Sequence, residues 1–210
     1  MVLSQREQRS DLTRAVASRR AAAQVDAYAA ELDALIDAAF AVVAETGSLD
    51  PPVRQILRTA GLSNAAFYRH VEGKDELLLL MLDRGRHELV AYLDRLVAAC
   101  DEPTGRLRVW IDGVMAQARD EDAARRTRPF IAQADRLAEL FPDEQQRSEQ
   151  LLIDQLAAST ATGPAAARAV YDVVFAALAR HLRRGTSADD VELDTLARIA
   201  AAILTTEEQP

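Results

Sequence analysis

The stretch from Val53 to Asp75 constrains the fold most, because it reads as two short amphipathic helices joined by a tight turn. In the first segment, apolar residues recur at the i, i+3, i+4, i+7 spacing that puts them on one buried helix face; they are Val53, Ile56, Leu57 and Ala60. Asp50 and Pro51 supply a start signal, since Asp can cap free N–H groups and Pro has no N–H to leave unpaired. Gly61 predicts that this helix ends in a left-handed turn.

The second segment begins at Ser63, which is expected to cap it, while Phe67 and Val71 lie one turn apart and can pin it to the first helix. The side chains opposite them suit contacts with DNA, because Asn can bond adenine, Arg can bond guanine and Ala can touch a thymine methyl group. We therefore predict a helix-turn-helix that reads DNA; the alternative is an ordinary helix pair with a polar outer side. The candidate DNA-binding residues are Arg54, Gln55, Ser63, Asn64, Ala65, Ala66, Tyr68, Arg69, His70 and Lys74.

This stretch resembles the DNA-binding domain of the tetracycline-repressor (TetR) family in both residue type and spacing. The matching positions are Ala60-Gly61-Leu62-Ser63, Phe67-Tyr68, His70-Val71 and Lys74-Asp75. Three places depart from the family pattern: Pro52 stands where a capping Thr is frequent, Leu57 where Ala is usual, and Ala65-Ala66 where Gly-Thr is common. Because Ala66 lacks a hydroxyl group, one phosphate contact implied by the resemblance is lost.

The composition predicts an all-α protein. Of 210 residues, 49% are apolar, which is enough for a packed core, while aromatic residues make up only 5% and runs with strand-like alternation do not occur. The unbroken apolar runs, such as residues 77–82, are all far shorter than the roughly 18 residues that a membrane span needs. With a polar N-terminus and a single cysteine, Cys100, the sequence predicts a cytoplasmic protein without a membrane segment.

The net charge of −8 is unusual for a protein that binds a polyanion. Whether this chain can bind DNA therefore depends on how its charges are distributed along the sequence. Bases exceed acids in residues 1–20 and again in residues 51–74, where four bases face Glu72 alone. Residues 26–50, by contrast, carry six acids and no base. An acidic protein with two basic patches can still bind DNA locally and in one orientation.

The expected organisation is an N-terminal three-helix DNA-binding domain followed by a helical ligand-binding and dimerisation domain. Residues 1–26 form a basic arm, mobile or partly helical, that either enters a minor groove or stays solvated. Residues 27–74 form the DNA-binding domain, with a first helix from about Ala27 to Glu45, and residues 75–205 the second domain. That domain opens with a long helix from Asp75 to about Cys100 and continues with helices to about Arg119, from about Arg128 to Leu140, over 143–161, and on both sides of Gly185; residues 206–210 are a tail.

The last two predicted helices each carry one apolar stripe. Such a stripe either forms a two-fold dimer interface or packs inside its own chain, and the pattern alone leaves both open. The resemblance to the TetR family implies the dimer interface. The candidate interface residues are Val170, Val174, Ala177, Leu178, His181, Leu196, Ala200 and Ile203.

Large residues scattered through the middle helices are either core residues or the walls of a cavity. The resemblance implies a small-molecule pocket within this helical domain. The candidate pocket residues are His87, Trp110, Met115, Phe130, Phe141, Tyr171 and Phe175.

The function expected from this resemblance is a homodimeric regulator, acting as a repressor, that binds a palindromic DNA operator and is released by a small-molecule effector. No catalytic residues, cofactor or metal are expected, because the three histidines are far apart, Cys100 has no base nearby in sequence, and no phosphate-binding loop occurs. The alternatives are a constitutive DNA-binding protein without an effector, and a helical carrier or enzyme that has kept a vestigial DNA-binding motif.

Overall fold

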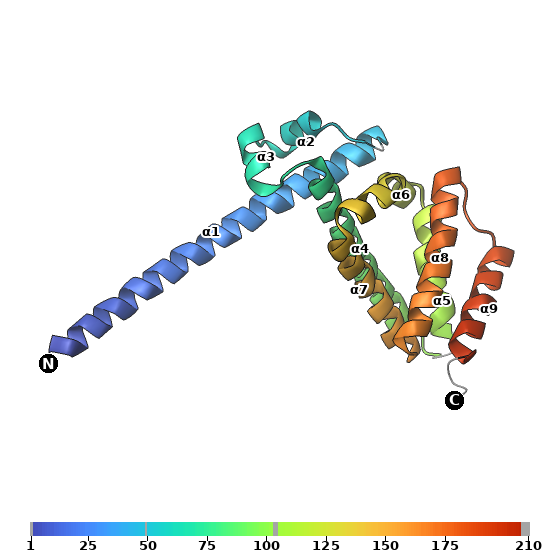
Figure 1. Cartoon of the computed structure of the whole chain (residues 1–210). Coiled ribbons are helices and arrows are strands. Elements are labelled where there is room, and N and C mark those ends of the chain that lie inside the picture. The colour runs from blue at the N-terminus through green and yellow to red at the C-terminus, as the bar shows by residue number, and fades with distance from the viewer. Residues whose placement is uncertain (1, 49, 103–104, 207–210) are drawn as a thin grey trace.

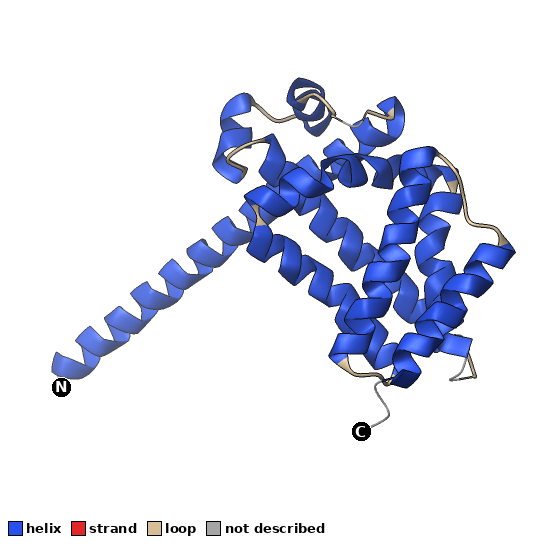
Figure 2. Cartoon of the chain, turned by 45° about the vertical axis from the view of Figure 1, so that its right-hand side comes forward, coloured by secondary structure: helices blue, strands red, loops and turns tan. Residues whose placement is uncertain are grey.

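The computed structural model describes residues 2–48, 50–102 and 105–206, and these ranges contain helices joined by short turns and no strand (Figures 1 and 2). The helices are α1 (Val2–Thr46), α2 (Val53–Ala60), α3 (Asn64–His70), α4 (Lys74–Ala98), α5 (Arg106–Arg119), α6 (Glu121–Leu140), α7 (Pro142–Thr160), α8 (Pro164–Arg184) and α9 (Asp190–Thr206). The predicted all-α fold with an N-terminal helix-turn-helix domain and a C-terminal helical domain is confirmed.

Two regions can be distinguished in Figure 1. The head consists of α2, α3 and the C-terminal half of α1, and the body consists of α5 to α9. Helix α4 starts in the head and runs along the body, where it packs against α5 and α7. No flexible spacer separates the two regions, since only residues 71–73 lie between α3 and α4.

Helix α1 is much longer than the sequence predicts. The helix expected from about Ala27 instead begins at Val2, so residues 2–26 extend the same rod away from the rest of the molecule (Figure 1). Alanine, arginine and glutamine favour helix, and residues 2–46 contain neither glycine nor proline to interrupt it. The predicted tail falls almost wholly on residues 207–210, which lie outside the described residues.

The core of the head also includes a helix of the body. Leu35, Ile56, Phe67 and Leu77 are at most 1% exposed and form one apolar cluster. Phe130 and Leu137 of α6 belong to the same cluster. The head therefore packs on the body through α6 as well as being joined to it by α4.

The body has a core of its own around Trp110, which is completely buried in α5. The Trp110 Nε1–H donates a hydrogen bond of 2.7 Å to Gln155 Oε1 on α7, so the one polar atom of the indole is satisfied. Helix α6 begins at Glu121 rather than near Arg128, because the Asp120 side chain accepts a hydrogen bond from the Ala123 N–H at 2.8 Å and caps it. In the described part of the chain no helix is long and apolar enough to cross a membrane.

Candidate DNA-binding surface and ligand pocket

The turn between α2 and α3 has the geometry that its sequence predicts. Gly61 adopts the left-handed conformation, with φ 67° and ψ 23°. The Leu62 N–H donates to the Leu57 carbonyl at 3.0 Å, and the Ser63 Oγ accepts from the Ala66 N–H at 3.1 Å. These bonds satisfy backbone groups at both helix ends, which fixes the angle between the two helices. The predicted cap at Ser63 is confirmed.

Asp50 does not cap α2, contrary to the prediction. Helix α2 begins at Val53, and Pro52 at its N-cap position makes no side-chain hydrogen bond. Asp50 pairs instead with Lys74, the first residue of α4, and so ties the loop before α2 to the loop after α3. Lys74, a predicted DNA contact, is therefore already occupied by a carboxylate in this structure.

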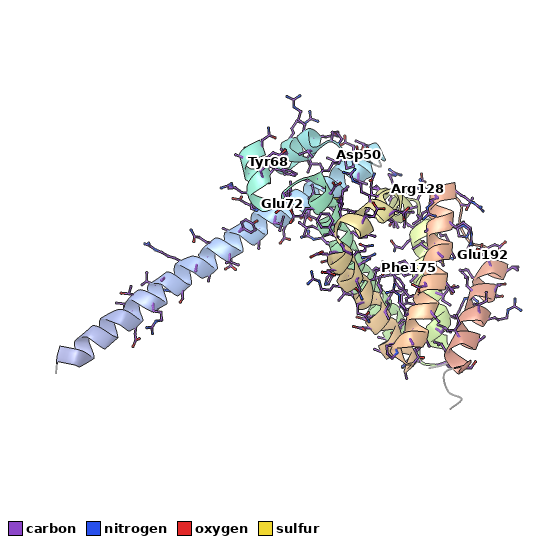
Figure 3. The ribbon with its side chains drawn as sticks, in the orientation of Figure 1. Asp50, Tyr68, Glu72, Arg128, Phe175 and Glu192 are labelled. Carbon is purple, nitrogen blue, oxygen red and sulfur yellow. The ribbon has the colours of Figure 1, made fainter. Side chains whose placement is uncertain are left out.

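One side of α3 is buried and the other is exposed. Phe67 and Val71 pack into the head with 1% and 3% of their surface exposed, as their spacing predicts. Tyr68 is 69% exposed and lies on α3 away from the body (Figure 3). The other predicted contacts that lie on the outside are Asn64, Ala65, Arg69, Ser63 and Arg54, while Gln55 is half-buried.

Two predicted DNA contacts, Ala66 and His70, are buried instead. His70 comes four residues after Ala66 and three after Phe67, so the three residues lie together on the helix side that faces the core. The His70 Nε2 is 2.7 Å from Glu31 Oε2 on α1, and its ring lies 4.3 Å from the ring of Tyr28. His70 thus attaches α3 to α1 and does not face a DNA backbone.

Tyr28 and Glu31 on α1 complete this attachment. The Tyr28 hydroxyl donates to the carbonyl oxygens of Arg69 and His70, at 3.0 and 3.3 Å. The hydrogen bond from His70 lowers the pKa of Glu31, and Arg69, 3.6 Å from the same carboxylate, adds to the effect. The sequence gives no signal for these two residues, since about forty positions separate them from their partners.

Two more acids of α1, Asp33 and Asp37, form ion pairs with Arg84 of α4; the bond from Arg84 Nη1 to Asp37 measures 2.7 Å. The acid-rich segment before the helix-turn-helix is thus partly neutralised by bases from α3 and α4. The negative charge near the exposed side of α3 is smaller than a count along the sequence suggests.

A cavity of about 530 Å³ lies where α1, α4, α5, α6 and α8 meet. Its apolar lining residues include Phe40, Leu82, Leu89, Phe130, Ile131 and Phe175. Its polar lining residues include Arg86, Glu88, Arg95, Gln117, Arg126 and Thr127. A volume of this size suits a small organic ligand.

Of the seven predicted pocket residues, Phe130 and Phe175 line this cavity, and Phe175 projects from α8 into the interior of the body (Figure 3). Trp110, Met115 and Tyr171 belong to the body core instead. Tyr171 stacks on Phe175 at 4.2 Å between ring centroids, and burial raises its pKa to about 12.

The two remaining candidate pocket residues, His87 and Phe141, do not line the cavity either. The His87 side chain is 59% exposed and its Nδ1 lies 2.9 Å from the Asp83 carbonyl oxygen, while Phe141 packs against the head core. Helical spacing marks a residue as buried or exposed but does not say whether a cavity lies beside it, which accounts for both results.

One wall of the cavity belongs to the head. The Phe40 ring of α1 makes an edge contact with Phe130 of α6, at 6.1 Å between centroids. The Arg126 guanidinium lies 5.1 Å from the centre of the Phe40 ring and 3.4 Å from Glu88 on α4. A molecule in the cavity would therefore contact both the head and the body.

The apolar stripes of α8 and α9 face inward, so the predicted interface residues do not form a free face. Seven of them are at most 7% exposed and pack inside their own chain, and Ile203 packs against the same core. They are Val170, Val174, Ala177, Leu178, His181, Leu196 and Ala200. The outward sides carry other residues, among them Ala165, Ala176, Val191 and Ile199; Val191 is 74% exposed and Ile199 43%.

Comparison with known proteins places the head in a sequence family. Residues 35–81 match the model of the bacterial regulatory proteins of the tetR family. The HTH-type transcriptional regulator BetI of Brucella anthropi is 36% identical over 73 residues, and BetI of Brucella canis matches to the same degree. The matched stretch covers 35% of this chain and 38% or 37% of those relatives, so the likeness in sequence is confined to the N-terminal part.

The similarity in fold extends over most of the chain. A regulator from Streptomyces coelicolor A3(2) superposes with a TM-score of 0.65 at 18% identity, covering 83% of this chain and 98% of that one. RolR, solved with the ligand resorcinol, superposes at 0.59 and 17% identity over 89% and 97%. FadR from Bacillus subtilis, solved with stearoyl-CoA, superposes at 0.51 and 16% identity over 82% and 95%.

Proposed function

We propose that this chain is a transcriptional regulator of the tetR family, whose model matches residues 35–81. In this proposal it represses transcription by binding a palindromic DNA operator as a homodimer and leaves the operator when a small-molecule effector binds. In this proposal residues 27–74 bind DNA, residues 75–205 bind the effector and the partner subunit, and residues 1–26 are a basic arm. The protein acts in the cytoplasm and is not an enzyme.

The observation that carries the proposal is the exposed side of α3 on a turn of fixed geometry. Asn64, Ala65 and Tyr68 offer an amide, a methyl group and a phenol to the edges of bases in a major groove. Arg54 of α2 is also exposed and reaches bases from the neighbouring helix. Ser63 and Arg69 hold the DNA backbone, and Lys74 joins them if the phosphate replaces Asp50 as its partner.

A second subunit is needed because one helix-turn-helix contacts too few bases for useful selectivity. The outward sides of α8 and α9 are the proposed interface. They lie next to each other at the edge of the body, and they combine small residues such as Ala176 with the exposed apolar side chains of Val191 and Ile199 (Figure 1). Two such helix pairs can pack as a four-helix bundle about a two-fold axis.

Effector binding is proposed to act through the shared wall of the cavity. A ligand that displaces Phe40 or Phe130 moves α1 relative to α6, and α4 carries the change along the body. The two α3 helices must lie about 34–36 Å apart to reach successive major grooves, so a small rotation of each head is enough to lose the operator. The ligand shifts the equilibrium only as far as it binds the two states with different affinity.

The test is selection of bound sequences from random DNA by the purified full chain. We expect a palindrome with half-sites about 10 base pairs apart. Arg54→Ala should weaken binding to that sequence by about 1–3 kcal/mol and relax the preference at one position, whereas Lys74→Ala should weaken binding to all sequences alike and flatten the salt dependence. Arg119→Ala is the matched control, since Arg119 is exposed at the C-terminal end of α5, outside α2 and α3.

Failure of the selection to enrich any sequence would contradict the proposal and favour a carrier or enzyme with a vestigial motif. An enriched sequence without two-fold symmetry would contradict the dimer. A palindrome that no small molecule releases would favour a constitutive DNA-binding protein.

The dimer is tested by sedimentation of Val191→Asp and Ile199→Asp, each of which places a charge in the proposed interface. Leu140→Asp is the control, because Leu140 is 51% exposed on α6, outside this surface. We expect monomers from the first two variants and a dimer from the third. If all three sediment like the unmodified chain, the interface lies elsewhere.

A further inference from the structure

The cavity between head and body has a charge opposite to that of the chain. Three arginines and one glutamate line it, in a protein whose net charge is −8. Glu88 is already paired with Arg126, at 3.4 Å. Of the other two arginines, both contributed by α4, Arg95 has no carboxylate partner and Arg86 has only Glu149, at 3.7 Å.

The Arg95 side chain, at the exposed edge of the lining, has no hydrogen-bond or ion-pair partner among the residues that the structure describes. Arg86 is buried, 9% exposed, and its hydrogen bonds to Gln145 are long, at 3.3 and 3.4 Å. Its nearest carboxylate, Glu149, is 3.7 Å away and is shared with Arg168 at 3.3 Å. A guanidinium group has five N–H donors, so both arginines retain donors for a further acceptor.

The rest of the lining is apolar and aromatic, with Phe40, Leu89, Phe130, Ile131 and Phe175 around the cavity. A molecule that fills this space removes water from the guanidinium groups. A neutral or cationic molecule would leave their charge without compensation, whereas an anionic oxygen would accept charge-assisted hydrogen bonds from them.

We infer that the cavity binds an amphipathic anion, a small molecule with an apolar body and a carboxylate or similar anionic group. The apolar body lies among the phenylalanines, and the anionic group is held by Arg95. This inference rests on the proposed function, whose effector it assigns to a chemical class. Because Phe40 belongs to the head, the apolar end of the ligand is the part that contacts the DNA-binding region.

The test uses two sets of probes, each with one apolar body and with a polar group that is anionic, neutral or cationic. One set is 2-naphthoate, naphthalene-2-carboxamide and 2-naphthylmethylammonium; the other is decanoate, decanamide and decylammonium. Affinity is measured by calorimetry on the full chain, with melting temperature as a second readout. In at least one set we expect the carboxylate to bind at least about tenfold more tightly than the amide. The ammonium compound should bind most weakly.

Arg95→Gln should weaken carboxylate binding about tenfold and leave amide binding unchanged, since it removes the charge but keeps an amide donor. Arg126→Gln provides a second variant at the same cavity. Arg119→Gln, at an exposed arginine outside the lining, is the matched control and should leave binding unchanged. Circular dichroism establishes that each variant is folded.

Equal or tighter binding of the amide or ammonium compounds would overturn the inference and leave the regulator with an effector of another class. Failure of all six probes to bind would overturn both the anion preference and this cavity as a site for such ligands. Selection of a palindrome from random DNA would still stand in either case, so the failure of this inference is distinguishable from failure of the DNA-binding function.

Discussion

The head and the body build their candidate sites in different ways. The exposed surface of the head comes from one short piece of chain, since α2, the turn and α3 together span only Val53–His70. The cavity takes its lining from five helices that are far apart in sequence, from Phe40 on α1 to Leu178 on α8. Local spacing is therefore enough to form the first site, whereas the second exists only once the helices have packed.

The two regions also differ in how their helices end. In the head, α1 and α2 are each followed by a glycine with positive φ, at Gly47 and Gly61. In the body, α8 ends in the same way at Gly185, but α7 ends at Ala161, which has φ 53° and is the one non-glycine residue with positive φ in the described part of the chain. An L-residue is strained in this conformation, so the head has the less strained helix ends.

The largest expected effect on stability comes from the body core. Trp110→Ala should lower the free energy of unfolding by about 3–5 kcal/mol, because it leaves a cavity and removes the partner of Gln155. Urea unfolding followed by circular dichroism measures the loss. Tyr68→Ala is the control in the head, since Tyr68 is 69% exposed and its replacement should change stability by no more than about 0.5 kcal/mol. Similar losses of unfolding free energy in both variants would contradict the difference between the packed core of the body and the exposed side of α3.

The second prediction concerns alkaline pH and again involves the body. Burial raises the pKa of Tyr171 to about 12, above the ordinary value of 10.0 that applies in the unfolded chain. The folded state holds this proton more tightly, so the contribution to stability is complete below pH 10 and is lost as the pH rises from 10 to 12. Between those limits the unmodified chain should lose up to about 2.7 kcal/mol more than Tyr171→Phe.

The measurement is urea unfolding followed by the fluorescence of Trp110, the single tryptophan of the chain. Tyr68→Phe is the matched control and should follow the unmodified chain, because Tyr68 lies exposed in the head. If Tyr171→Phe and the unmodified chain lose stability in parallel above pH 10, Tyr171 is not the group responsible.

The head could be predicted closely because its determinants are local. The spacing of Ile56, Leu57, Phe67 and Val71 identifies the buried side of both helices, and Gly61 and Ser63 identify the turn. Ala66 and His70, predicted as DNA contacts, are buried because they lie one turn apart on the side of α3 that faces the core. His70 lies one turn after Phe67, and its Nε2 pairs with Glu31 on α1.

For the body, the spacing of apolar residues predicts which side of each helix is buried, but not which element covers it. The stripe that includes Val170 and Val174 is buried as expected, but periodicity does not identify what covers it, and the structure packs it inside its own chain. Arg86, Arg95 and Arg126 carry no sequence signal that separates them from the other arginines. Their shared cavity arises from the packing of α4 against α6 and of α6 against α8, which no local pattern encodes.

The third prediction tests the turn of the head by exchanging glycine for alanine. Gly61→Ala should lower stability by about 1–2 kcal/mol, because φ is 67° there even though no atom lies within 4 Å of the added Cβ. Gly85→Ala is the matched control: Gly85 lies within α4, where the added Cβ also meets nothing within 4 Å, and alanine should raise stability by about 0.5–1 kcal/mol. Effects of the same sign at both sites would show that φ does not govern the turn.

The smallest expected effect comes from the reverse exchange in the body. Ala161→Gly removes the strain of an L-residue with positive φ, worth about 1–2 kcal/mol. It also makes the unfolded chain more flexible, which offsets about 0.4–1 kcal/mol of that gain. We therefore expect a net increase in stability of about 0.5 kcal/mol, measured by urea unfolding.

Ala158→Gly is the control for this exchange, since Ala158 is exposed within α7 and glycine there should lower stability by up to about 1 kcal/mol. If Ala161→Gly also destabilises the chain, the Ala161 backbone does not hold its left-handed conformation in solution. The hydrogen bond from the Thr162 N–H to the Ala157 carbonyl, 3.1 Å long, depends on that conformation and would be lost with it. In that case α7 would end without the backbone cap that α2 has in the head, and the contrast between the two regions would be greater than the structure shows.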